Sequence, residues 1–321
     1  MNGATLHTRP PGQRGAVVFE PGGYARHAGE RVPERQRLRM LLLVFARDQW
    51  RSTKSKLFAG LFVLPALVMA AIVIVRAKLD FQGLAVPPGE QAKWIATLLH
   101  YHGLIVTGFL LAGLGTQVAP QIARDAHEGA LLLYFSRPVL RPHYLFARWG
   151  AACLSGLGQI LAPALLLMLV MLSQYGLQPG GCPLPGAAGA LWWLALLVAQ
   201  VLAAAAAVAM ASLVALAAGA IVRNPSSAPL AFGGVILGST AASWVAQAAW
   251  GRESAARALD LHQAMSSVWA LLSFPIDPSR PPNTKAMAAA GGLVLWIALA
   301  AGAWWALQRF LANPPLGKGR S

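Results

Sequence analysis

Six long apolar runs divide this sequence and decide which folds are open to it. They cover residues 57–75, 94–120, 151–175, 190–222, 229–250 and 286–308. The hydrocarbon core of a bilayer is about 30 Å thick, so a helix needs about 20 mostly apolar residues to cross it. A membrane barrel would show shorter strands of alternating polarity instead. The sequence therefore predicts an all-α, polytopic membrane protein with six transmembrane helices.

The composition excludes two other classes of protein. Hydrophobic residues make up 56% of the chain and charged residues 12%, whereas a soluble domain carries about 25% charged residues. An ordinary soluble enzyme could not cover its surface with so few charges, and an intrinsically disordered chain would be less apolar. Cys153 lies in an apolar run and Cys182 in a Gly- and Pro-rich loop, so both are expected to be free thiols.

The net charge of +15 is distributed unevenly between the loops. If the N-terminus lies in the cytoplasm, 19 Lys and Arg residues fall on the cytoplasmic side and 7 on the outside. Lys and Arg accumulate in the cytoplasmic loops of membrane proteins. Both termini are therefore predicted to be cytoplasmic, and the protein to lie in the cytoplasmic (inner) membrane. The same bias explains the high net charge without a nucleic-acid partner.

The chain divides into three predicted parts. Residues 1–33 are rich in Arg, Gly and Pro and are expected to form a disordered basic cytoplasmic tail. Residues 34–311 form the six-span membrane domain, and residues 312–321 a short cytoplasmic tail.

The start of the membrane domain predicts an additional helix. Apolar residues recur there at helical spacing between basic ones, at Leu38, Leu41, Leu42 and Phe45. This pattern is typical of a basic amphipathic helix that lies at the cytoplasmic interface and leads into the first span. A solvated basic linker is the alternative.

The cores of the six runs are predicted to contain no Asp, Glu, Lys, Arg or His, which argues against a proton-coupled pump or a channel with a charged filter. Polar side chains do occur in the runs, at Thr116, Gln117, Gln159, Gln200, Ser239, Thr240, Ser243 and Gln247. Each is a candidate for lining a transport pathway. Hydrogen bonding between helices is the simpler explanation for any one of them.

Motifs for catalysis are not found in the sequence. Gly317-Lys318 lacks the upstream glycine and the following Ser or Thr of a phosphate loop, and Leu131 stands where a zinc helix starting at His127 needs its second histidine. His100 and His102 could meet a metal near the external face, but no acidic or cysteine partner is near them in the sequence. We therefore expect no catalytic residue, no metal site and no cofactor in this chain.

Residues 117–149, between the second and third runs, are the least ordinary part of the sequence. Gln121, Arg124, Asp125 and Glu128 fall on one helical face, and Ile122, Ala126, Gly129 and Leu133 form another. This helix is predicted to continue through the apolar residues 131–135 and to break near Arg137, because proline follows. A second break is expected at Arg141-Pro142, followed by a helix into the third span. A solvated loop is the alternative.

This segment resembles the type-2 ATP-binding-cassette (ABC) exporter permeases. The resemblance is carried by residues 124–133, RDAHEGALLL, then Ser136-Arg137-Pro138-Val139, Arg141 and Tyr144. Two departures stand out: Ala147-Arg148 replaces the usual Gly-Lys, and Ala130-Leu131-Leu132 replaces the common Thr-Leu-Glu. The resemblance covers about 30 residues in detail, and the six-span arrangement extends it to the membrane domain.

The resemblance implies a permease subunit that couples ATP hydrolysis on a separate ABC ATPase subunit to export. ATP and Mg²⁺ would bind to that partner. The permease would work as a dimer with a second permease copy or with a homologous permease, surrounded by membrane lipids. The segment between spans two and three would be the coupling helix, with the implied contact residues Arg124, Asp125, Glu128, Gly129, Ser136, Arg137, Pro138 and Arg141. Asp125 and Glu128 would meet basic groups of the ATPase, and Arg137 and Arg141 acidic ones.

Two other functions remain open at this point. The chain could transmit mechanical work to an extracytoplasmic partner instead of moving cargo, or it could be a membrane scaffold or assembly factor that transports nothing.

The external segment 251–285 carries Leu261, Met265, Val268 and Leu272 at helical spacing. Because only about ten of its residues are sufficiently apolar, an interfacial or re-entrant helix is expected there and not a seventh span.

Overall fold

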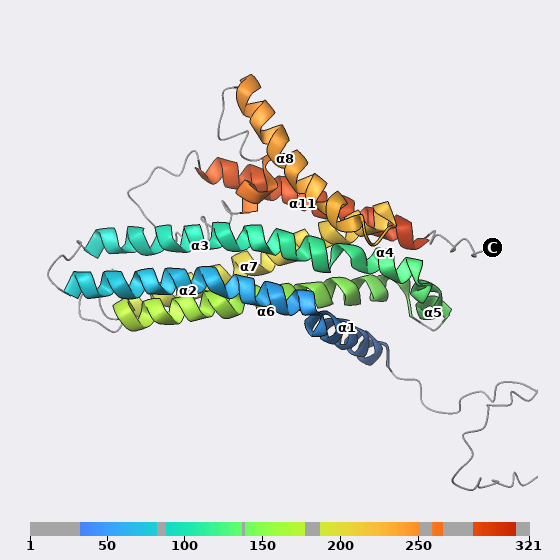
Figure 1. Cartoon of the computed structure of the whole chain (residues 1–321), viewed down its shortest axis with the longest axis horizontal. Helices are drawn as coiled ribbons and strands as arrows, with labels where there is room; N and C mark the ends of the chain where they lie inside the picture. The colour runs from blue at the N-terminus through green and yellow to red at the C-terminus, as the bar shows by residue number, and fades with distance from the viewer. Residues whose placement is uncertain are drawn as a thin grey trace, which may run out of the picture.

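The chain folds into a bundle of long helices that run side by side (Figure 1). The computed structural model describes residues 33–81, 88–136, 139–176, 187–250, 259–265 and 285–312. All regular elements in these residues are helical. Six helices in the described part are long and apolar enough to cross a membrane. They are α2 (Thr53–Phe81), α3 (Pro88–Gln117), α6 (Arg141–Met171), α7 (Ala187–Val222), α8 (Ala228–Trp250) and α11 (Lys285–Ala312). The prediction of six apolar spans is confirmed.

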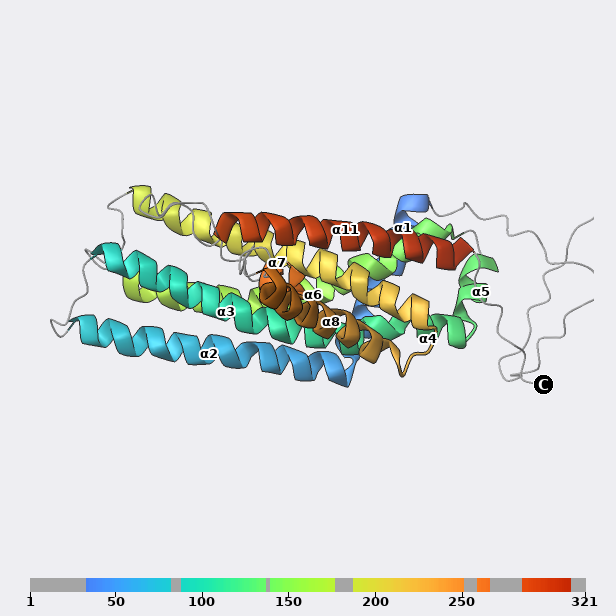
Figure 2. The same ribbon diagram turned by 90° about the horizontal axis from the view of Figure 1, so that it is seen from above.

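Shorter elements connect or flank these six. They are α1 (Glu34–Arg51), α4 (Ala119–His127), α5 (Ala130–Ser136) and a π-helical turn, η1 (Leu172–Gly176), that extends α6. α1, α4 and α5 lie at the same end of the bundle, where α11 also ends (Figures 1 and 2). We refer to this end as the α4 end.

α7 lies at the centre of the bundle and packs against α4, α6, α8 and α11. Its small residues permit this close packing. A Cβ at Gly219 would lie 1.8 Å from the carbonyl oxygen of Ala119, so α7 crosses the start of α4 at backbone contact distance. A Cβ at Gly156 of α6 would likewise lie 2.7 Å from Cγ1 of Val208. The alanine-rich fourth run therefore serves close helix packing, as small residues commonly do in membranes.

Aromatic side chains gather near both ends of the bundle. At the end opposite α4, Trp94 packs edge-on against Tyr175, with 5.9 Å between ring centroids, and Arg76 lies 4.7 Å above the Trp94 ring. At the α4 end, Phe146 contacts Trp304 with a centroid distance of 4.9 Å. Trp and Tyr are enriched where a membrane protein meets the two bilayer surfaces. Their placement agrees with spans that run along the long axis of the bundle.

The chain turns sharply between α1 and α2 at Ser52. The Ser52 hydroxyl accepts a hydrogen bond from the amide of Ser55 at 3.1 Å and donates one to the carbonyl of Gln49 at 2.9 Å. A serine in this position caps the first turn of a helix and satisfies one of its free amides. α1 consequently runs across the bundle and not along it (Figure 2).

The segment after α3 differs from its prediction. The helix predicted to continue to residue 135 is broken at Gly129, which has φ +74°, so that α4 ends at His127 and α5 begins at Ala130. Glycine adopts this left-handed conformation without a steric penalty and commonly ends helices. The helix predicted to start at about His143, after a break at Arg141-Pro142, begins two residues earlier, at Arg141, with the proline in its first turn. Residues 137 and 138, where another break was predicted, lie outside the described residues.

The segment 251–285, predicted to be external, is described only at 259–265. Leu261 and Met265 are buried there, and the amide of Leu261 donates to the Ser239 hydroxyl, near the middle of α8, at 3.2 Å. The Trp296 indole of α11 donates to the Leu261 carbonyl at 3.0 Å. The chain therefore returns between α8 and α11, in agreement with a re-entrant segment, whose polar backbone groups must be satisfied by protein. Val268 and Leu272 lie outside the described residues.

Candidate functional site

A buried ion pair joins α4 to α6 at the α4 end. Nη2 of Arg148 lies 2.7 Å from Oδ1 and 2.5 Å from Oδ2 of Asp125. The hydroxyl of Tyr144, one turn before Arg148 on α6, donates a hydrogen bond to the same carboxylate. Asp125 is 7% exposed and Tyr144 is fully buried. The carboxylate thus has two partners on α6, which fixes the position of α4 relative to that helix.

Aromatic rings from two further helices enclose this pair. The Phe45 ring of α1 lies 3.7 Å from the guanidinium carbon of Arg148, which is cation–π distance. Phe45 also packs edge-on against Tyr134 of α5 and against Tyr144, at centroid distances of 5.8 and 5.9 Å. Burial raises the pKa of the Tyr134 hydroxyl. We call Phe45, Asp125, Tyr134, Tyr144 and Arg148 the Asp125 cluster; it joins α1, α4, α5 and α6.

The outer side of α4 is exposed and charged. Arg124, His127 and Glu128 all reach solvent, whereas Ile122 and Ala123 are fully buried. Gly129 follows, and a Cβ there would meet no atom within 4 Å, so the turn between α4 and α5 is open on this side. α4 therefore has one side anchored in the bundle and one side available to a partner.

The predicted coupling residues divide between these two sides. Arg124 and Glu128 are exposed as expected, but Asp125 is buried in the intramolecular pair and not on the polar face with them. Arg141 donates through Nη1 to the carbonyl of Ala312 at the end of α11, at 3.2 Å. The Ser136 side chain and residues 137–138 lie outside the described part. Neither Phe45 nor Arg148 was predicted to contact Asp125, because both lie far from it along the chain.

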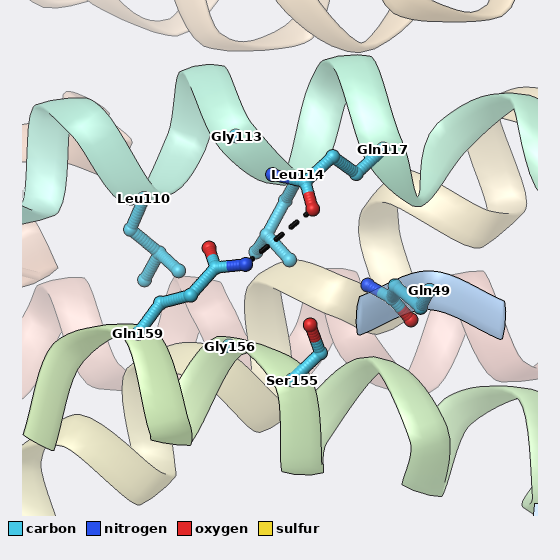
Figure 3. A pocket seen from close by; sticks show the side chains of 8 residues that line it. All are labelled: Gln49, Leu110, Gly113, Leu114, Gln117, Ser155, Gly156 and Gln159. Carbon is cyan, nitrogen blue, oxygen red and sulfur yellow. Dashed lines mark hydrogen bonds between the residues drawn. The ribbon is translucent and has the colours of Figure 1, made fainter. Parts of the chain in front are cut away.

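The polar residues predicted to line a pathway fall into separate places. Gln117 and Gln159 line a cavity of about 10 Å³ together with Gln49 and Ser155 (Figure 3). The amide of Gln159 lies 3.5 Å from Oε1 of Gln117 and donates to the Ser55 hydroxyl at 2.8 Å. A cavity of this size holds about one water molecule. These residues form a polar junction between α1, α2, α3 and α6 and do not line a cargo-sized space in this conformation.

Three of the six remaining pathway candidates donate hydrogen bonds within their own helices. Thr116 donates to the carbonyl of Ala112 at 3.0 Å, and Ser239 and Thr240 both donate to Ile236, at 2.6 and 3.3 Å. Gln200 and Ser243 are buried, and Gln247 is exposed. The hydroxyl groups of Thr116, Ser239 and Thr240 therefore donate within their own helices and not between helices as expected. Hydrogen bonding between helices is seen for Gln159, which donates to Ser55 of α2.

The histidines do not assemble a metal site in the described residues. His102 of α3 is fully buried, and neither ring nitrogen has a hydrogen-bond partner within the described part of the chain. No group of three potential ligands occurs there. His102 lies in the candidate span Thr97–His127, directly before residues 103–120, the part of the second run that contains no ionisable side chain. The His100 side chain lies outside the described residues.

The chain matches no protein-family model, no curated protein and no solved structure. Its resemblance to the type-2 ABC exporter permeases therefore remains a prediction that rests on residues 124–144 and on the six apolar helices. A functional hypothesis must account for a helix, α4, that is anchored on one side by a buried ion pair and presents charged residues on the other.

Proposed function

We propose that this chain is the permease subunit of an ABC exporter, in which a separate ATPase subunit binds ATP and Mg²⁺. The permease would sit in the cytoplasmic membrane with both termini in the cytoplasm and pair with a second permease copy. The positive charge bias of 19 to 7 supports this orientation. In this arrangement the α4 end faces the cytoplasm, where an ATPase would be reached.

The observation that carries the proposal is the two-sided construction of α4. The exposed residues Arg124 and Glu128, in α4 and directly after it, offer charges to a partner, and the buried Asp125 is held by Arg148 of α6. A force applied to the outer side of α4 is passed to α6 through two short hydrogen bonds. Because Phe45 packs on Arg148, α1 would follow the same movement.

The open turn at Gly129 suits a docking element. Charged groups around it would set the orientation of the partner more than the overall affinity. Closure of two ATPases on ATP would draw the α4 helices of two permease copies together, and the six-span units would rock between inward- and outward-open states. Small and apolar residues dominate the bundle interior, which favours a lipid-like or amphipathic cargo.

The proposal is tested by co-purification of the full chain from its native membrane. We expect an ATPase with a phosphate-binding loop to accompany the chain, and the chain alone to hydrolyse no ATP. Glu128→Arg should weaken this association, since opposed charges at a docked interface cost several kcal/mol. Asp48→Arg reverses an exposed carboxylate on α1 and is the matched control.

Equal retention of an ATPase by the Glu128→Arg variant and the Asp48→Arg control would remove Glu128 from the docking surface. If no ATPase co-purifies at all, a membrane scaffold becomes the better interpretation.

Export and mechanical coupling to an extracytoplasmic partner use the same α4 surface. Stimulation of the associated ATPase by a small amphipathic molecule would favour export.

A further inference from the structure

α1 has a second apolar side that faces away from the rest of the protein. Its inner side, with Phe45 and Gln49, is buried against α6. On the opposite side, Met40, Leu43 and Val44 are each about half exposed, at 50%, 53% and 53%. Three neighbouring apolar side chains exposed on one side of a helix indicate that another molecule or segment contacts them there.

Basic side chains surround this outer apolar side. In the stretch of residues 34–56, seven residues are Lys or Arg and two are acidic. Arg47 and Arg51 follow Leu43 and Val44 along the same side of the helix, and Lys54 and Lys56 continue into α2; all four are exposed. None of the four forms an ion pair within the described residues.

The position of α1 adds a geometric argument. The helix crosses the bundle close to the turn at Ser52, so its axis runs across the spans and not parallel to them (Figure 2). It therefore lies along the plane in which one face of a bilayer would meet the spans. Trp50, at the turn, is 40% exposed and also contacts α6, as an interfacial aromatic residue would.

We propose that the outer side of α1, formed by Met40, Leu43, Val44, Arg47 and Arg51, is a docking surface for anionic phospholipid. The acyl chains would cover the three apolar residues, and the headgroup phosphates would meet the two guanidinium groups. A helix with apolar side chains flanked by basic ones binds anionic bilayer surfaces through both contributions. This inference concerns lipid binding alone and does not depend on an ATPase partner.

Charge complementarity favours lipid over the other possible covers. A second copy of the chain would bring the same basic residues, and two such surfaces would repel each other. The N-terminal residues 1–32 carry four Arg and two Glu, so they have the same sign of net charge. A bilayer that contains phosphatidylglycerol offers the opposite charge and an apolar layer directly below it.

The headgroup contribution is tested on the full chain without any ATPase. The chain is reconstituted in nanodiscs of phosphatidylcholine and phosphatidylglycerol, and its preference for each lipid is measured with spin-labelled lipids. Each basic group near an anionic surface contributes about fivefold in affinity, so Arg47→Gln/Arg51→Gln should reduce the preference for phosphatidylglycerol at these sites roughly 25-fold. Arg47→Lys/Arg51→Lys keeps both charges and should keep the preference.

An unchanged preference for phosphatidylglycerol in the glutamine variant, or an equal loss in the lysine variant, would overturn the proposal.

A second measurement leaves both arginines in place. A nitroxide at position 44, in a chain with Cys153 and Cys182 replaced by Ala, should collide with lipid-soluble oxygen more than with a water-soluble nickel complex. A nitroxide at Ser226, in the exposed turn between α7 and α8, is the reference and should show the opposite ratio.

Three outcomes at position 44 contradict lipid docking. A nickel accessibility equal to that at Ser226 would place the outer side of α1 in water. Dipolar broadening between the nitroxides of two chains would show that a second copy covers it. Protection that disappears when residues 1–32 are deleted would show that the N-terminal segment of the same chain is the cover.

Discussion

Gly158 of α6 lies directly against Trp50 of α1: a Cβ at position 158 would come within 2.6 Å of Cζ2 of the indole. Eight residues earlier on the same helix, a Cβ at Gly150 would lie 2.9 Å from Cδ1 of Leu42. Two glycines of α6 therefore receive two large side chains of α1. The contact fixes α1 across the end of the bundle, next to the Asp125 cluster.

Gly158→Ala is expected to destabilise the protein by about 1–3 kcal/mol, because overpacking a tight contact costs this much. The indole is a rigid group that cannot fold away from the added methyl group. Thermal unfolding in a mild detergent measures the effect. Gly302→Ala is the matched control, since a Cβ at Gly302 of α11 meets nothing within 4 Å. If the two variants unfold at the same temperature, α1 is not held at Gly158.

A second glycine should tolerate no side chain at all. The Cβ of Gly219→Ala would lie 1.8 Å from the backbone oxygen of Ala119, and backbone cannot move aside as a flexible side chain can. We expect a strong loss of folded, monodisperse protein in size-exclusion chromatography. Gly233→Ala on α8, where a Cβ meets no neighbour within 4 Å, should give a normal yield. A normal yield of Gly219→Ala would mean that α7 and α4 are farther apart.

The six spans could be predicted from the sequence because each needs only a long apolar run. Their ends could not be predicted equally well. Hydropathy alone starts the third span at residue 151, whereas α6 begins at Arg141 and buries Tyr144 and Leu145. Only the proline at position 142 indicated the earlier start of the helix. These first turns mix apolar and charged residues, and hydropathy alone does not separate a buried amphipathic turn from a loop.

The Asp125 cluster was beyond prediction for a different reason. Periodicity placed Asp125 with Arg124 and Glu128 on a polar face, yet it lies at the border of that face and turns inward. A residue at the border of two helix faces is buried if a side chain inside the bundle can pair with it, and exposed otherwise. Arg148 is that partner, and its distance of 23 residues along the chain gives no periodic signal.

Gly129 provides a test of the turn between α4 and α5. Its φ of +74° is costly for residues with a Cβ, whereas the surrounding space is open. Gly129→Ala should therefore lower stability by about 1 kcal/mol through backbone strain alone. Gly129→Asn should lose less, because asparagine visits this conformation more readily. Thermal unfolding of both variants decides the point; equal stability of the alanine variant and the parent chain would contradict the positive φ.

Removal of either partner of the buried pair should be more damaging than removal of both. Asp125→Leu leaves the Arg148 charge buried and Arg148→Met leaves the Asp125 charge buried, and breaking a buried pair in this way costs about 3–5 kcal/mol. The double variant leaves no unpaired charge and replaces the pair by apolar groups, which is often close to neutral. Denaturant unfolding of the four proteins gives the coupling energy between the two positions.

The same double-mutant cycle separates an internal role of Asp125 from a direct contact with an ATPase. If Asp125 pairs with Arg148, as the structure has it, Arg148→Met should restore both stability and ATPase association to the Asp125→Leu chain. If Asp125 instead meets a basic group of the ATPase, the stability of Asp125→Leu should stay near that of the parent, and Arg148→Met should restore nothing. Additive losses in the double variant would show that the two side chains are not paired in the membrane.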